Sequence, residues 1–108
     1  MSPRPPDFPS VPPPPAPFFS VIVPCCDVEP YLPECLASLL EQPFADWECL
    51  LVVEESRDGT LGLARDRAAA DPRFRVFTGP RTGSCSVPRN RGIEEARGRY
   101  AVFLDGDD

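Results

Sequence analysis

Four apolar runs of strand length punctuate the chain after residue 17. They are "FFSVIVP" (Phe18–Pro24), "WECLLVVE" (Trp47–Glu54), "FRVFT" (Phe74–Thr78) and "YAVFL" (Tyr100–Leu104). The runs are rich in β-branched and aromatic residues, and they are apolar at nearly every position instead of alternating. This pattern predicts strands of a sheet that is covered on both faces.

Helical periodicity fills the first two intervals between these runs. The first interval starts near Pro30–Leu32, where a proline is tolerated in the first helical turn. Its apolar stripe consists of Leu32, Cys35, Leu36, Leu39 and Leu40. The second helix is expected to be capped by Asp58 or Thr60, and the residues expected to face inward are Leu61, Ala64 and Ala68.

The third interval, "SVPRNRGIEEARG", predicts a helix that begins with Ser86 as its cap and stops at Gly98. We expect Gly92, Ile93 and Ala96 on its inner face. Gly92 has no side chain and would let the helix lie close to the sheet.

The order β-α-β-α-β-α-β predicts an α/β fold with an open, mostly parallel sheet and right-handed crossovers. Residues 18–108 form the single predicted domain. Residues 1–17 hold nine of the 16 prolines, so neither a helix nor a sheet ladder can run through them. We expect a disordered, polyproline-leaning tail; the alternative is a ligand for a proline-binding module.

Charge and cysteine content exclude several classes of function. All 11 basic residues are scattered arginines and the net charge is −6, so no nucleic-acid footprint is expected. Five cysteines without a CxxC pair, and no histidine, exclude the usual zinc sites. Cys35 and Cys49 are expected in the core. A reduced, cytoplasmic setting fits, and no apolar run approaches membrane-spanning length.

Carboxylates follow three of the four predicted strands, in "PCCDV", "EESRDG" and "DGDD". Because the carboxyl ends of parallel strands meet at one edge, we expect these acids to converge there and to raise one another's pKa. A cation would relieve the repulsion, and oxygen ligands suit Mg²⁺ or Mn²⁺. The alternative is that "DGDD" is an acidic turn.

The segments "FFSVIVPCCDVEPYLPECLASLLEQPFADWECLLVVEESRDGT" and "SVPRNRGIEEARGRYAVFLDGDD" resemble the nucleotide-binding half of family 2 glycosyltransferases, which have the GT-A fold. The resemblance covers Phe18–Asp108 and rests on several motifs in the right order and spacing. It implies a donor site for a nucleotide-diphosphate sugar, with Mg²⁺ or Mn²⁺ as cofactor.

The resemblance also implies individual roles. The loop Pro24–Val28, with Pro24, Cys26 and Asp27, holds the base, and Val53 and Glu54 stand where an acidic pair reads base and ribose. Arg89 and Asn90 are expected near the diphosphate. The D-x-D falls on Asp105 and Asp107: Asp107 is expected to bind the metal, and Asp105 to lie near the ribose and the metal.

Several residues depart from the family pattern. Cys26 replaces the usual base-stacking aromatic, Asp27 replaces asparagine, and Val53 removes one carboxylate of the acidic pair. Glu54 is one methylene longer than the usual aspartate, and Pro88 replaces a small helix former. These departures leave the base undetermined.

The leading interpretation is the N-terminal, donor-binding portion of a longer glycosyltransferase whose acceptor is an unknown glycan, lipid or polymer, located in the cytoplasm or at the inner membrane face. The acceptor half and general base are expected outside this sequence, so the activity of the chain alone is uncertain. The alternatives are a non-catalytic truncated remnant and an interaction module driven by the proline tail.

Two other classes are disfavoured. A dinucleotide-binding oxidoreductase needs a G-x-G-x-x-G loop after the first strand, which is absent. A receiver-type phospho-acceptor domain needs a lysine, and the sequence contains none.

Overall fold

The computed structural model describes residues 16–105. Seven elements follow one another in the order β1 (Phe19–Cys25), α1 (Leu32–Leu40), β2 (Trp47–Glu54), α2 (Thr60–Ala70), β3 (Phe74–Gly79), α3 (Ser86–Glu95) and β4 (Tyr100–Phe103). The predicted alternation is therefore confirmed. Residues 1–15 of the predicted tail, and Asp107 of the predicted metal site, lie outside the described residues.

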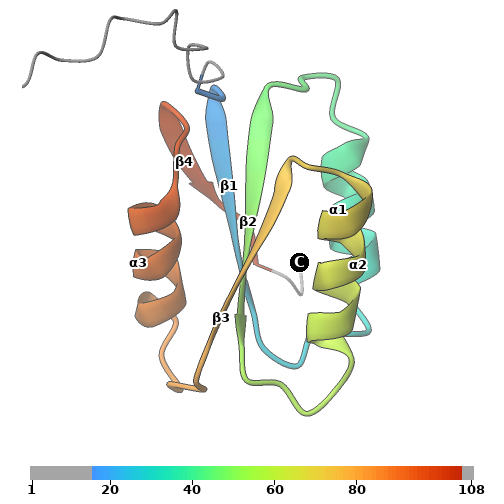
Figure 1. Ribbon diagram of the computed structural model, residues 1–108, viewed down its shortest axis with the longest axis vertical. Helices are drawn as coiled ribbons and strands as arrows, with labels where there is room; N and C mark the ends of the chain where they lie inside the picture. The colour runs from blue at the N-terminus through green and yellow to red at the C-terminus, as the bar shows by residue number, and fades with distance from the viewer. Residues whose placement is uncertain (1–15, 106–108) are drawn as a thin grey trace, which may run out of the picture.

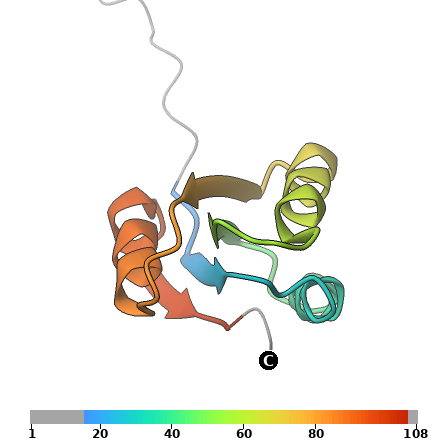
Figure 2. The ribbon, with the colours of Figure 1, turned by 90° about the horizontal axis from the view of Figure 1, so that it is seen from below.

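The four strands form one open sheet in the order β3-β2-β1-β4, and every pair is parallel, as the sequence predicted. Helices α1 and α2 lie on one face and α3 lies on the other (Figures 1 and 2). The chain first winds outward from β1 to β3 and then returns to place β4 on the other side of β1. Ligands of such sheets bind beyond the carboxyl ends of the strands, beside the point where the winding reverses.

The main core lies between the sheet and the α1–α2 layer. Val21, Val23 and Cys25 of β1 belong to the same buried cluster as Leu32 and Leu36 of α1. This arrangement confirms the predicted apolar stripe of α1, in which Leu32, Cys35, Leu36 and Leu39 are buried. Cys35 and Cys49 are 2% and 0% exposed, as core residues should be.

Helix α3 lies against the opposite face through Gly92, as predicted. A Cβ atom at this position would overlap Cγ2 of Ile22, on β1. The close approach sets the position of the first turn of α3, at the carboxyl edge of the sheet.

The end of α3 differs from the prediction. The helix stops at Glu95, because Ala96 is extended with a ψ of 138°. The N–H groups of Arg97 and Gly98 donate to side chains of the sheet, Glu48 Oε2 at 2.6 Å and Ser20 Oγ at 2.7 Å. These tertiary bonds draw the chain out of the helix before Gly98.

The predicted inner face of α3 is wrong at one residue. Ile93 is 50% exposed, whereas Gly92 is buried. Ile93 directly follows Gly92, about 100° further around the helix, so its side chain points away from the sheet. An apolar residue there was therefore a misleading signal of burial.

Strand β4 is not covered on both faces as its apolar sequence predicted. All four of its residues are exposed, with Tyr100 at 55% and Phe103 at 44%. The strand lies at the sheet edge and pairs with β1 alone among the described strands. An edge strand has one neighbour, and within residues 16–105 no helix packs closely over β4, so its side chains lack the cover that β1 and β2 receive.

Within residues 16–105, every helix is too short or too polar to cross a membrane.

Candidate functional site

A cavity of about 300 Å³ opens at the carboxyl edge of the sheet. Its wall includes Pro24 near the end of β1 and Cys26 after it, Glu54 at the end of β2, Arg89 on α3 and Asp105 after β4. Residues predicted from three strand ends and one helix are thus brought to one place. The cavity lies where β4 returns beside β1, the position at which open α/β sheets bind ligands.

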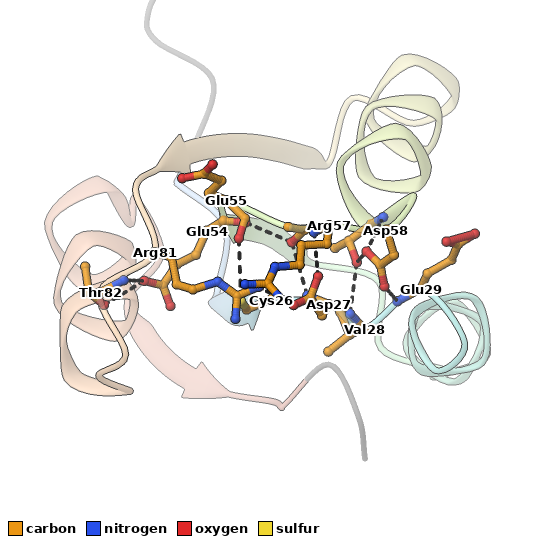
Figure 3. A network of polar contacts seen from close by, with 12 residues as sticks. Cys26, Asp27, Val28, Glu29, Glu54, Glu55, Arg57, Asp58, Arg81 and Thr82 are labelled. Carbon is orange, nitrogen blue, oxygen red and sulfur yellow. Dashed lines mark hydrogen bonds and ion pairs between the residues drawn. The ribbon is translucent and has the colours of Figure 1, made fainter.

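The loops after β1 and β2 are joined by backbone-to-side-chain bonds (Figure 3). The Val28 N–H donates to Thr60 Oγ1 at 2.9 Å, and the Gly59 N–H donates to Glu29 Oε1 at 2.7 Å. The Glu29 N–H in turn donates to Asp58 Oδ2 at 3.1 Å. The predicted base-binding loop is therefore anchored from its far side.

Asp27 lies at the centre of this junction. Its backbone is in the left-handed region, with a φ of 52°, a conformation that aspartate tolerates better than most residues. Its Oδ1 accepts the Arg57 N–H at 2.6 Å, and its Oδ2 forms an ion pair with Arg81. The carboxylate is therefore bonded to two neighbouring loops, and Asp27 is not among the residues that line the cavity.

The expectation that the acids raise one another's pKa is wrong for Asp27 and Asp58. The hydrogen bond from Arg81, helped by the Arg57 N–H, lowers the pKa of Asp27 below its ordinary value. The bond from the Thr60 hydroxyl lowers the pKa of Asp58 in the same way. The chain's own donors thus relieve the repulsion that the sequence assigned to a cation.

Cys26 presents a half-buried thiol to the cavity and donates a weak bond to the Glu55 carbonyl at 3.7 Å. Burial is the largest influence on this thiol and raises its pKa, so it is protonated at neutral pH. It offers neither a flat surface for a base nor a reactive thiolate.

Glu54 faces the loop between β3 and α3. Its Oε2 accepts both the N–H and the hydroxyl of Thr82, at 2.7 and 2.6 Å. Its neighbour Val53 is buried, with 3% exposure, and presents no polar group. Glu54 therefore stands alone where the family resemblance implied an acidic pair, and it holds the opposite loop in place.

Arg89 and Asp105 form an ion pair within the cavity, with Nη2 and Oδ1 3.3 Å apart. The Nε atom of Arg89 is buried and has no hydrogen-bond partner among the described residues. Asn90, the next residue, is exposed and is not among the lining residues. Of the two residues predicted near a diphosphate, the structure brings only Arg89 to the cavity.

The family comparison agrees with this geometry. A family model described as Glycosyl transferase family 2 matches residues 20–108. The chain belongs to this family. The resemblance that the sequence motifs suggested is confirmed.

Known glycosyltransferases are similar to this chain over most of its length. It is 45% identical over 92 residues to the uncharacterized glycosyltransferase EpsJ of Bacillus subtilis (strain 168), a match that covers 85% of this chain and 26% of EpsJ. The chain thus spans about a quarter of the length of that relative.

Two solved structures share the fold. S. aureus TarS 1–349 in complex with UDP-GlcNAc superposes with a TM-score of 0.77 and 32% identity, over 83% of this chain and 26% of that 1–349 chain. Mannosyltransferase PcManGT from Pyrobaculum calidifontis, solved with GDP-Man and Mn²⁺, has a TM-score of 0.77 and 26% identity, over 85% of this chain and 28% of PcManGT. The predicted GT-A fold is confirmed.

Sequence reasoning missed the loop between β3 and α3 of this family 2 domain. Arg81, Gly83, Ser84 and Cys85 all line the cavity, and Gly83 has a φ of 70° that favours glycine. The rule that strand ends meet at one edge applies to β3 as well. No acid follows β3 in "GPRTGS", so this strand end carried no signal of a site.

Of the two predicted metal-binding residues, Asp105 lies among the described residues and Asp107 does not. Asp107 lies outside residues 16–105, and within that range no group of three or more histidine, cysteine, aspartate or glutamate side chains could hold a metal ion. The cavity nevertheless has the carboxylate of Asp105 in its wall. Mg²⁺ and Mn²⁺ commonly use one or two protein carboxylates together with substrate phosphates, so this donor set fits them.

Proposed function

We propose that this chain is the donor-binding portion of a glycosyltransferase and that it binds a nucleoside-diphosphate sugar in the cavity at the carboxyl edge of the sheet. The observation that carries the proposal is the convergence of Glu54, Arg89 and Asp105 on this cavity. The complexes of TarS with UDP-GlcNAc and of PcManGT with GDP-Man support the same class of ligand.

The base would enter between the Pro24–Val28 loop and Glu54. Glu54 already accepts two bonds through Oε2, which leaves Oε1 as the acceptor for a base N–H. The anchoring of the loop by Thr60 and Asp58 means that little ordering is needed when the base binds.

The diphosphate would lie near Arg89. A guanidinium binds phosphate oxygens through charge-assisted hydrogen bonds, and the long 3.3 Å contact to Asp105 can be exchanged for a shorter one. The Nε of Arg89, which has no hydrogen-bond partner within residues 16–105, is a further donor. Asn90 lies outside the cavity on α3, so it would bind the ligand only where the ligand extends beyond the cavity onto that helix.

A divalent metal would be held by Asp107 together with Asp105. When bound, Mg²⁺ or Mn²⁺ would act as a Lewis acid and stabilise the charge of the departing nucleoside diphosphate. Transfer also needs an in-line acceptor hydroxyl and a positioned base. We assign neither to this chain, and the acceptor class stays open among glycans, lipids and polymers.

The direct test is a titration of the 108-residue chain with UDP and GDP, each with Mn²⁺ and with EDTA, followed by thermal unfolding. A ligand that binds only the folded state raises its stability by RT ln(1 + [L]/Kd), about 2.7 kcal/mol at 100 times Kd. We expect such a rise with at least one nucleotide and a smaller rise in EDTA. Asp107→Asn should remove the metal dependence, whereas Asp66→Asn, on α2, should not.

A folded chain that responds to neither nucleotide would contradict the proposal. It would favour the second candidate, a non-catalytic remnant. Two observations point that way, since Cys26 cannot stack on a base and Val53 is buried where a carboxylate was expected.

A further inference from the structure

The cavity lacks the flat partner that a nucleobase usually finds. No aromatic side chain lines it within residues 16–105, and Cys26 stands where an aromatic would stack. Stacking on a flat side chain typically strengthens nucleotide binding by about tenfold or more per base. A base bound in this cavity therefore needs another planar side chain on which to stack.

Arg81 is a planar group in the right position. It lines the cavity together with Cys26 and Glu54, and its side chain is 42% exposed. Its ion pair with Asp27, the residue that follows Cys26, brings the guanidinium to the carboxyl end of β1. A guanidinium stacks on aromatic rings and on bases through its flat faces.

The orientation of Arg81 is fixed from one edge. Its Nη2 donates to Asp27 Oδ2, while Asp27 is itself held by the Arg57 N–H at 2.6 Å and by Ser56 Oγ, which accepts the Asp27 N–H at 3.1 Å. Figure 3 shows Arg81 reaching from the β3–α3 loop toward Asp27 across the end of β2. An ion pair made through one edge leaves the faces of the guanidinium available.

We propose that the Arg81 guanidinium, held by Asp27, is the surface on which the base of the donor stacks, in place of an aromatic side chain at position 26. This inference rests on the proposed function, because it presumes that a nucleoside diphosphate enters the cavity. It also gives Asp27 a role as a positioning residue, which orients Arg81 without contacting the ligand.

The test separates stacking from charge. Arg81→Lys keeps the positive charge and loses the plane, and Arg81→Ala loses both. Binding of UDP, of GDP and of inorganic pyrophosphate, which has no base, is measured for the 108-residue chain in Mn²⁺. Arg91→Lys, on the exposed side of α3, is the matched control, and thermal unfolding without ligand checks that each variant folds.

We expect both Arg81 variants to bind the better nucleotide about tenfold more weakly, while Arg81→Lys binds pyrophosphate as the wild type does. Adding Cys26→Tyr to Arg81→Ala should restore nucleotide binding, because it supplies a flat partner from the neighbouring strand end.

Two results would overturn the inference and leave the proposed function standing. In one, Arg81→Lys binds the nucleotide as tightly as the wild type, so that charge alone matters. In the other, nucleotide and pyrophosphate lose affinity equally, so that Arg81 contacts phosphate. If wild-type protein binds no nucleotide, the proposed function itself fails.

Discussion

The two ends of the sheet each hold arginine–carboxylate pairs, but in opposite surroundings. At the amino end, Glu48 and Arg75 have side chains that are 8% and 20% exposed. At the carboxyl end, Arg89 and Asp105 are 40% and 48% exposed, and Arg81 and Asp27 are 42% and 34% exposed. The same chemistry is buried at one end and open to solvent at the other.

The carboxylate at the amino end also accepts more hydrogen bonds than the one at the carboxyl end. Glu48 accepts from Ser20 Oγ at 2.6 Å, from the Arg97 N–H at 2.6 Å and from Arg75 Nη1 at 2.9 Å. Asp105 has only the 3.3 Å contact from Arg89 to its carboxylate among the described side chains. Removing one partner of a buried pair costs about 3–5 kcal/mol, whereas exposed pairs contribute about 0–1 kcal/mol. The amino end therefore stabilises the fold, and the carboxyl end keeps donors that a ligand can recruit.

The largest expected effect is at the amino end. Glu48→Ala leaves the Ser20 hydroxyl, the Arg97 N–H and the Arg75 guanidinium without their acceptor. We expect the free energy of unfolding to fall by about 3 kcal/mol. Urea denaturation followed by circular dichroism would measure it.

Asp105→Asn is the matched control at the carboxyl end and should change the free energy of unfolding by less than about 1 kcal/mol. If the two substitutions destabilise the chain equally, the contrast between the ends is wrong.

The second prediction concerns α3, which connects the two ends. Gly92→Ala would place a Cβ against Ile22 and push the helix from the sheet, so we expect a loss of about 2 kcal/mol in the free energy of unfolding. Gly62→Ala, on α2, meets no atom within 4 Å and should raise stability by about 0.5–1 kcal/mol. The same urea experiment compares them; two shifts of the same sign would contradict the close packing of α3.

The sequence predicted the elements wherever local pattern decides them. The bounds of β2, Trp47–Glu54, match the structure, and four of the five stripe residues on α1 are buried as predicted, Leu40 being half-buried. The end of α3 could not be predicted, because Arg97 and Gly98 are captured by Glu48 and Ser20, which are distant in sequence. The exposure of β4 was hidden for a similar reason, since an apolar run does not reveal that its strand lies at an edge.

The sequence predicted where the site lies better than it predicted which side chains pair with one another there. The end of each strand could be read from the sequence, so the meeting of Glu54 and Asp105 at one cavity followed from the parallel order. The pairing of Asp27 with Arg81 did not, because it depends on where an irregular loop places a long side chain. Motif spacing identified residues of the family, but not the donors that neutralise them.

The third prediction tests the carboxyl end through binding. Arg89→Ala should weaken nucleotide binding about tenfold, the value of one charge-assisted hydrogen bond, and change the free energy of unfolding by less than about 1 kcal/mol. Arg91→Ala, two residues further on the same helix, is the control. Calorimetric titration with UDP or GDP in Mn²⁺ distinguishes them; equal affinities for both variants would remove Arg89 from the proposed site.

The smallest expected effect is a dependence on pH. Arg81 and the Arg57 N–H hold the pKa of Asp27 below its ordinary 3.8. A carboxyl whose pKa is lower in the folded state stabilises the fold above its unfolded pKa and loses that contribution as the pH falls through the folded value. Wild type should therefore be slightly more stable than Asp27→Asn at neutral pH, and the difference should shrink below pH 3.8. Thermal melts from neutral pH to about pH 3 measure this difference, with Asp66→Asn as control; a gap that persists in acid would show that Asp27 acts through its shape and not its charge.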